Sequence, residues 1–232
     1  TTHEEAPRYQ IHELLRQFAA EQLDAQPEER ATIAACHSAY YLTFIADREH
    51  RLARHEPRQA ATEIQQELDN VRQAWLFAVK EANCTLLDKS VSGLARYYDT
   101  TGLLGESIQV LGQTAAMLEA GGPKPIVDTE NSPSNQVLLS KLLAIQAAAM
   151  VKQGKFDEGM ALAQKAATVG AAVGGIEGEV YGQMVVGQGL YRKGHYQEAH
   201  LHFTELLRLI ARHQSQKDTL ELLNDAEYTA HI

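Results

Sequence analysis

The chain has 232 residues, 44% of them apolar, and a formal net charge of −9 from 21 Lys and Arg against 30 Asp and Glu. This length and composition allow a buried core, so we expect a globular protein. The acidic balance argues against nucleic-acid binding through a basic face. No apolar run approaches the roughly 20 residues that span a bilayer, so we expect no membrane segment.

The ends and the cysteines indicate a cytoplasmic setting. The chain does not begin with Met, and its first five residues do not resemble a secretion signal, so we expect a piece of a longer protein. Cys36 and Cys84 are the only cysteines and lie far apart in the sequence. A reduced, cytoplasmic protein with both cysteines in the core is the expectation, and a disulfide between them is the alternative.

Apolar residues recur at intervals of three and four over the first half of the chain, which predicts helices with one apolar stripe each. Only six prolines and little alternation of Val and Ile with polar residues make strands a poor fit. We expect five helices: 11–24, stopped near Pro27; 33–52, ending before Pro57; 61–79; 87–98, ended by Gly102; and 104–118, stopped by Gly121.

Residues 120–136 break this pattern with a cluster of Gly, Pro, Asn and Ser. The segment is longer than most connections inside a compact domain. We therefore expect a mobile insertion.

The second half of the chain contains a repeated turn. The segment 153–159 (QGKFDEG) matches 193–199 (KGHYQEA), and the turn glycines Gly154 and Gly194 are 40 residues apart. A short Gly turn followed by an aromatic and then a small residue is the turn of a tetratricopeptide-like repeat, where the first helix of a pair ends and the second begins. A degenerate third copy fits at Gly102, and residues 218–232 would begin one more repeat.

The repeat pattern also predicts packing. Phe156 and Tyr196 should lie between the helices of their pairs, while the small residues Gly159 and Ala199 should let those helices approach closely. In the second unit, Gly187 and Phe203 also fall at the usual positions of the repeat.

The run 9–19 (YQIHELLRQFA) resembles the end of the winged-helix domain in NB-ARC-type signalling ATPases of the STAND class. In that family a Met-His-Asp triplet opens the last winged-helix helix, and here the triplet is Ile11-His12-Glu13. Residues 67–75 (ELDNVRQAW) are similar to the helix that follows the winged helix in bacterial members, and 39–42 (AYYL) fits the helix before it. Together these blocks cover roughly residues 8–119.

The resemblance implies an all-α chain with four parts. These are the end of a winged-helix domain (1–26), a helical linker with a degenerate first repeat (27–119), the mobile loop (120–136) and tetratricopeptide-like repeats forming a right-handed superhelix (137–232). In the family, His12 would face the β-phosphate of bound ADP and hold the resting state. The chain contains no phosphate-binding loop and no basic recognition helix, so ADP or ATP is expected only with a nucleotide domain outside it.

No arrangement of residues meets the requirements for catalysis. His195, His200 and His202 lie close together in the sequence, but His200 and His202 would point about 200° apart on a helix, so a solvated helix is favoured over a metal site. We expect no cofactor or metal in this chain.

The concave face of the repeats is the candidate binding surface. Aligning the turn glycines places an excess of Lys and Arg on the first helices, with two tyrosines beside them, and predicts a basic groove for an acidic peptide, a nucleotide-like ligand or a self-docking acidic segment. Scattered solvated charge is the alternative. The residues are Lys89, Arg96, Lys141, Lys152, Tyr181, Tyr191 and Arg192.

Three functions follow from these observations. The first is a non-catalytic sensor or scaffold arm of a STAND-type regulator, with transcription as the expected output, which binds a protein, peptide or ligand and controls its own nucleotide domain. The second is a free-standing tetratricopeptide adaptor that holds two proteins together. An enzyme built on a helical solenoid is a remote third. A phosphate-binding loop encoded before Thr1 would support the first, and an initiator Met there would support the second.

Overall fold

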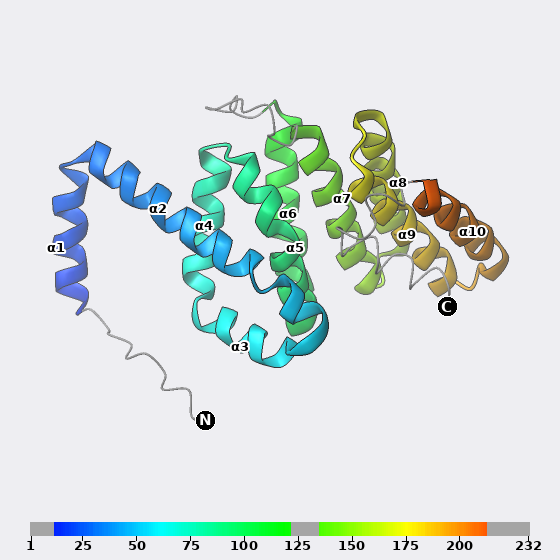
Figure 1. Ribbon diagram of the computed structural model, residues 1–232, viewed down its shortest axis with the longest axis horizontal. Coiled ribbons are helices and arrows are strands. Elements are labelled where there is room, and N and C mark those ends of the chain that lie inside the picture. Colours follow the sequence, from blue (N-terminus) through cyan, green and yellow to red (C-terminus); the bar gives the residue numbers. More distant parts are fainter. Residues whose placement is uncertain (1–11, 122–134, 213–232) are drawn as a thin grey trace.

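The computed structural model describes residues 12–121 and 135–212, and within these ranges every regular element is a helix. The all-α prediction is confirmed. The helices follow one another along the long axis of the molecule (Figure 1). They are α1 (Glu13–Asp24), α2 (Pro27–Ala46), the short π-helix η1 (Arg51–His55), α3 (Pro57–Gln66), α4 (Leu68–Lys80), α5 (Cys84–Thr101), α6 (Leu104–Glu119), α7 (Asn135–Lys152), α8 (Phe156–Val173), α9 (Ile176–Arg192) and α10 (Tyr196–Arg212).

The three expected turn glycines adopt the same left-handed conformation, with φ of 73° at Gly102, 83° at Gly154 and 84° at Gly194. Each turn also has the same two hydrogen bonds. The glycine N–H donates to the carbonyl three residues back, and the next N–H donates to the carbonyl five residues back. Glycine reaches positive φ without the strain a Cβ would cause. The prediction of one turn repeated three times is therefore confirmed.

Close helix contact is confirmed at Gly159; in the second pair the close contact is made at Gly187, and Ala199 is buried. A Cβ on Gly159 would lie 2.7 Å from Val151 Cγ2, and one on Gly187 would lie 2.5 Å from the Phe203 ring. Phe156 packs against the core as expected. The prediction for Tyr196 is wrong, because its side chain is 63% exposed and lies edge-on to the ring of Tyr191.

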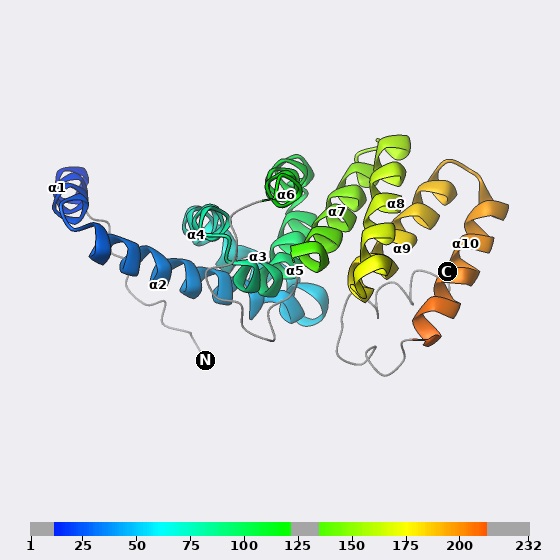
Figure 2. The same ribbon diagram turned by 90° about the horizontal axis from the view of Figure 1, so that it is seen from above.

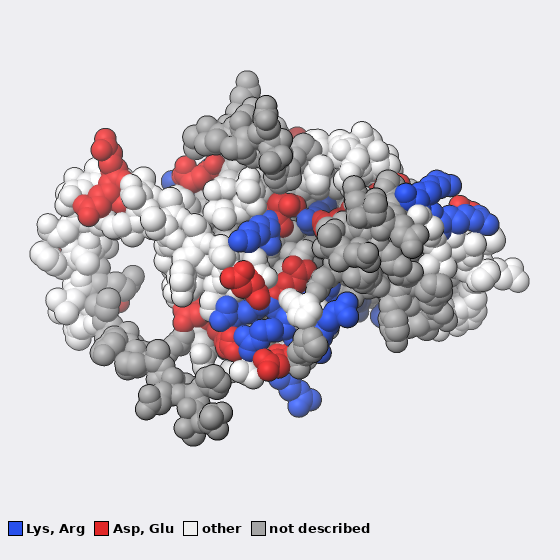
Figure 3. Space-filling view, viewed as in Figure 1, with Lys and Arg blue, Asp and Glu red and all other residues white. Residues whose placement is uncertain are grey.

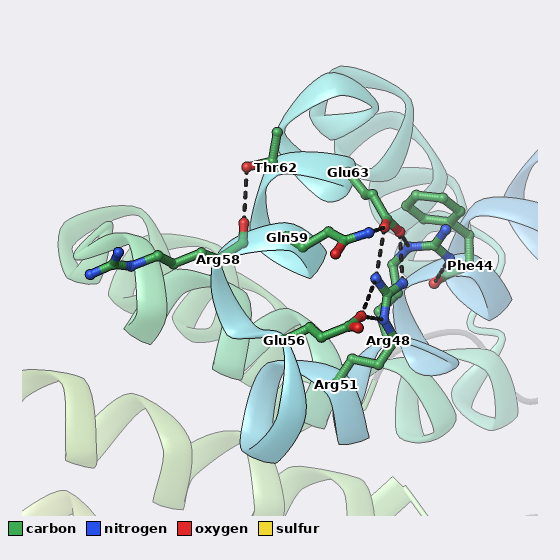
Figure 4. A network of polar contacts seen from close by, with 8 residues as sticks. All are labelled: Phe44, Arg48, Arg51, Glu56, Arg58, Gln59, Thr62 and Glu63. Carbon is green, nitrogen blue, oxygen red and sulfur yellow. Dashed lines mark hydrogen bonds and ion pairs between the residues drawn. The ribbon is translucent and has the colours of Figure 1, made fainter. Parts of the chain in front are cut away.

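The predicted helix 33–52 differs at both ends, because α2 begins at Pro27 and ends at Ala46. Pro is favoured in the first turn of a helix, where its missing N–H costs nothing. After Ala46 the chain bends into η1, and Arg48 holds the bend (Figure 4). Its guanidinium donates to the carbonyl of Phe44 at 2.9 Å, stacks on that ring and donates to Glu63 at 2.9 Å.

The predicted single helix 61–79 is two helices, α3 and α4. Glu67 leaves the helical conformation with φ −110° and ψ 10°. Its carboxylate accepts hydrogen bonds from Asn70 at 2.8 Å and from Tyr41 at 3.3 Å, which stabilises the break. Both Ile64 and Leu68 are thereby buried on either side of the break.

Two apolar clusters form the interior, and α7 contributes to both. The larger cluster draws on α2 to α8, and the smaller on α7 to α10. Since α7 packs against α5, α6, α8 and α9, it is buried on nearly all sides. Seen from above, α4 and α6 lie on one side of the molecule, and α2, α3 and α5 lie on the other (Figure 2).

The cysteines do not form a disulfide. Cys84 is buried, as expected, and donates towards Asn135 Oδ1 at 3.1 Å. Cys36 is exposed, so its assignment to the core is wrong. Most of the predicted loop, residues 122–134, and the predicted final helix at 218–232 lie outside the described residues.

Candidate binding cleft

A cleft of about 300 Å³ lies where the first helices of three successive pairs meet. Each of α5, α7 and α9 contributes a stripe that spans eight residues, and the start of α6 adds to the lining. The lining is Ser92, Ala95, Arg96 and Asp99 from α5, Leu104 and Ser107 from α6, Ile145, Ala148, Ala149 and Lys152 from α7, and Tyr181, Met184 and Gln188 from α9.

Small side chains create this hollow. Ala95, Ala148 and Ala149 face the cleft at positions where larger residues would fill it. Aligning the helices on their turn glycines places α5, α7 and α9 along one face, and all three contribute to the cleft lining. Three of the predicted binding residues, Arg96, Lys152 and Tyr181, line it together.

Two ion pairs join α5 to α7 on either side of the cleft. Lys141 Nζ lies 2.9 Å from Asp88 Oδ1, and Lys152 Nζ contacts Asp99 Oδ1. The second pair lies eleven residues after the first on both helices, which is three helical turns and about 16 Å. The pairs therefore hold α5 and α7 parallel and in a fixed register.

Lys141 is not the solvent-facing groove residue that the repeat alignment predicts. Only 7% of its side chain is exposed, and its ammonium contacts both Asp88 and Glu177. Burial opposes its charged form, yet the two carboxylates outweigh burial and raise the pKa of Lys141. Lys141 is buried because α7 packs against both α5 and α9, which supply its two carboxylate partners. Its contribution is to the packing of the three helices.

The prediction of an unbalanced basic groove is also corrected. Lys152 pairs with Asp99, and Arg96 Nε lies 3.7 Å from Glu49 Oε1. Figure 3 shows Lys and Arg interspersed with Asp and Glu over the middle of this face. Sequence alignment of the first helices missed these carboxylates because they come from neighbouring positions and from the segment after α2. The matched spacings Asp88–Asp99 and Lys141–Lys152 were the available signal.

The remaining predicted groove residues lie outside the cleft lining. Lys89 is exposed on α5, while Tyr191 and Arg192 are exposed at the end of α9. Tyr191 contacts the Tyr196 ring at a centroid distance of 5.4 Å. These three residues are therefore not brought together with Arg96, Lys152 and Tyr181.

Three polar side chains in the cleft have unused hydrogen-bonding capacity. Ser92, Ser107 and Gln188 make no side-chain hydrogen bond to the part of the chain that the structure describes. Ser92 and Ser107 are buried residues, with 8% and 3% exposure. The cleft therefore mixes small and apolar side chains with convergent polar groups, and such polar groups are what fix the orientation of a ligand.

A second hollow of about 580 Å³ separates α4 from α6. Leu76, which is 61% exposed, stands in its wall, and Trp75 donates to Thr114 at 3.0 Å beneath it. At one end Arg72 donates to both carboxylate oxygens of Glu106 at 2.7 Å. The hydrogen bond from Arg72 lowers the pKa of Glu106 despite partial burial. Apolar periodicity did not predict this hollow, since the stripes of α4 and α6 have the pattern of ordinary core faces.

His12 is exposed at the start of α1, where its Nδ1 accepts a hydrogen bond from the Leu14 N–H at 3.3 Å. It therefore caps the helix. Ile11, the first residue of the family triplet, lies outside the described residues.

The histidines at and just before α10 have different surroundings. His195 Nδ1 lies 3.0 Å from Glu198, while His202 is partly buried and burial lowers its pKa. Over the described residues no cluster of three or more His, Cys, Asp or Glu is arranged to hold a metal ion. Among the described helices none combines the length and apolarity that a membrane span requires.

Comparison with protein-family models gives no match for this chain, and searches of curated proteins and of solved structures find no similar protein.

Proposed function

We propose that this chain is a non-catalytic binding arm of a STAND-type regulator. Its cleft between α5, α7 and α9 takes a protein segment or ligand, and binding there biases the switch of a nucleotide domain, with transcription as the output. The observation that carries the binding role is the cleft itself, where Ser92, Ser107 and Gln188 have unused hydrogen-bonding capacity in a hollow lined by both apolar and charged side chains. The STAND assignment is supported by the sequence blocks around His12 and Trp75 and by the repeated glycine turn.

The proposed mechanism is a shift between two arrangements of the helices. A ligand that contacts α5, α7 and α9 at once favours the arrangement in which these three helices are closest. Since α9 and α5 face one another across the cleft and both contact Lys141, through Glu177 and Asp88, the proposed movement of one end of the array against the other is centred here. The binding energy of the ligand sets the size of the shift.

A display selection with random peptides tests the binding role. Selected peptides are then measured against Ala95→Leu, which fills the cleft, and against Ala161→Leu, a matched change on the exposed side of α8. We expect most peptides to lose at least about tenfold in affinity with Ala95→Leu and none with Ala161→Leu. Equal binding to both variants would show that the cleft is not the binding surface.

A further inference from the structure

The hollow between α4 and α6 has the size of a small-molecule site. Its volume of about 580 Å³ falls within the range of about 300–1,000 Å³ that is typical of such sites. The lining runs over residues 71–79 of α4 and 106–114 of α6, which is eight helical steps or about 12 Å on each helix. A helix about 10 Å across and about 12 Å long would occupy about 940 Å³. The dimensions therefore favour a compact ligand over a docked helix.

The walls of the hollow are apolar and its floor is closed. Figure 2 shows α4 and α6 on the same side of the molecule. Trp75 of α4 and Leu94 of α5 form the floor, and each is 2% exposed. Leu76 stands in one wall, and the partly buried Val110 stands in the opposite wall. A ligand in the hollow would remove this apolar surface from water, which favours binding.

The buried polar groups of the lining already have partners. The Trp75 indole N–H donates to the Thr114 hydroxyl at 3.0 Å, and that hydroxyl donates to the Val110 carbonyl at 2.9 Å. The Tyr98 hydroxyl donates to Glu106 at 3.1 Å. Within the described lining, no buried side-chain nitrogen or oxygen lacks a hydrogen-bond partner. The inner part of a ligand therefore needs no polar atoms, and any that it carried would be buried without partners.

The lining carries no net charge. Arg72 and Glu106 are its two charged residues, and two hydrogen bonds of 2.7 Å pair them. Arg72 also donates to Asp69 at 2.9 Å. A charged ligand would lose water on entering the hollow and would have to compete with these existing pairs. An uncharged ligand has no such cost.

We propose that the hollow between α4 and α6 binds an uncharged, apolar small molecule whose single polar group lies at the mouth. The apolar part lies against Trp75, Leu76 and Val110. Gln109 and Gln113 are exposed, lie four residues apart on α6, and make no side-chain hydrogen bond to the part of the chain that the structure describes. Their amides both donate and accept, so they suit the polar group of the ligand. The hollow shares no lining residue with the cleft between α5, α7 and α9.

The test compares two fluorescent probes with one carbon skeleton. N-phenyl-1-naphthylamine is uncharged and apolar with a single N–H, and 8-anilinonaphthalene-1-sulfonate adds a sulfonate to the same skeleton. Trp75 is the only tryptophan of the chain, so its fluorescence reports on this hollow. We expect the uncharged probe to quench Trp75 saturably with one probe per chain. The sulfonate should bind at least about tenfold more weakly.

Two pairs of variants locate the binding. Leu76→Asp puts a carboxylate in the wall of the hollow, and Leu201→Asp makes the same change on α10 at a similarly exposed position. Val110→Phe fills the hollow, and Val173→Phe is its control at the exposed end of α8. We expect both hollow variants to weaken the uncharged probe at least about tenfold, and both controls to leave its affinity unchanged. Because Leu76 is exposed, its variant keeps the fold even if Val110→Phe does not.

Each other outcome overturns the inference in a distinct way. Equal affinity for the two probes would rule out the uncharged class of ligand. Binding of the uncharged probe without quenching of Trp75, or an equal loss in Leu76→Asp and Leu201→Asp, would place the binding outside the hollow. The absence of saturable binding would reject the site altogether. None of these results affects the cleft between α5, α7 and α9, which is tested separately by the selected peptides.

Discussion

Lys141 of α7 lies 2.9 Å from Asp88 of α5, and the same kind of pair recurs eleven residues later between Lys152 and Asp99. Because eleven residues make three helical turns, both pairs lie on one side of each helix. They set α5 and α7 parallel and in register, and the cleft lies between them. The shape of the cleft therefore depends on the pairs as well as on the alanines that line it.

Replacing Lys141 with Met should destabilise the fold. The change leaves Asp88 and Glu177 close together and largely buried without their cation. Removing one partner of a buried ion pair costs 3–5 kcal/mol, and partial exposure of both carboxylates reduces this to about 3 kcal/mol. Urea unfolding measures the loss. Lys89→Met, at an exposed position of α5, is the control and should stay within about 0.5 kcal/mol. A similar small change for Lys141→Met would mean that the contacts of Lys141 with Asp88 and Glu177 do not stabilise the packing of α5, α7 and α9.

Acid should weaken the bend after α2 through Glu63. The hydrogen bond from Arg51 lowers the pKa of Glu63 from its ordinary value of 4.5 against the opposing influence of burial. A lowered pKa contributes stability above pH 4.5 that disappears as the pH falls through the folded-state pKa. Glu63→Gln should therefore cost about 1 kcal/mol at pH 7, because the pairs are partly screened by solvent, and much less at pH 3.

Thermal unfolding between pH 3 and 7 gives both values. Asp69→Asn is the control, since Asp69 pairs with Arg72 while 90% of its side chain is exposed. If the stability cost of Glu63→Gln does not change with pH, the ionised Glu63 carboxylate does not stabilise the bend.

Gly182→Ala should separate α9 from α8. An added Cβ would lie 2.7 Å from the Ala163 carbonyl oxygen and 2.9 Å from the Ala167 nitrogen, and neither backbone atom can rotate away. Overpacking of this kind costs about 1–3 kcal/mol and outweighs the gain in helix propensity. Gly105→Ala is the matched control, because its nearest neighbour is the Gln153 side chain at 3.8 Å. Denaturant midpoints compare the two, and equal midpoints would show that the helices are free to shift apart.

His12→Ala should separate the local role of this residue from its proposed switch role. In this chain the substitution removes the hydrogen bond from Leu14 N–H at an exposed helix start, which costs about 1 kcal/mol or less. In a regulator that carries a nucleotide domain before this segment, the family resemblance implies weaker ADP retention and higher basal signalling. Nucleotide content of the purified full-length variant measures this, and unchanged ADP occupancy would reject the switch role.

The helices and their turns were largely predictable from the sequence, because local signals determine them. Gly102, Gly154 and Gly194 each mark a turn whose geometry needs glycine, so spacing alone located them. The breaks at Ala46 and Glu67 were missed because apolar periodicity continues across them. Side-chain contacts made by Arg48 and Glu67 to distant residues decide these breaks, and periodicity carries no information about such contacts.

The cleft was predictable in outline and its charge was not. Aligning turn glycines places Arg96, Lys152 and Tyr181 on one face, because equivalent positions of successive helices share a face. The burial of Lys141 and the partners Asp88, Asp99 and Glu49 depend on how α5, α7 and the bend after α2 approach one another. A count of Lys and Arg on the first helices leaves out these neutralising carboxylates.

The most direct test of the binding cleft uses methyl-labelled alanine and a peptide from the display selection. The account predicts intermolecular nuclear Overhauser effects from the peptide to the methyl groups of Ala95, Ala148 and Ala149, and none to those of Ala116 and Ala161 on the exposed sides of α6 and α8. Contacts to Ala116 or Ala161 without contacts to the three cleft alanines would contradict it.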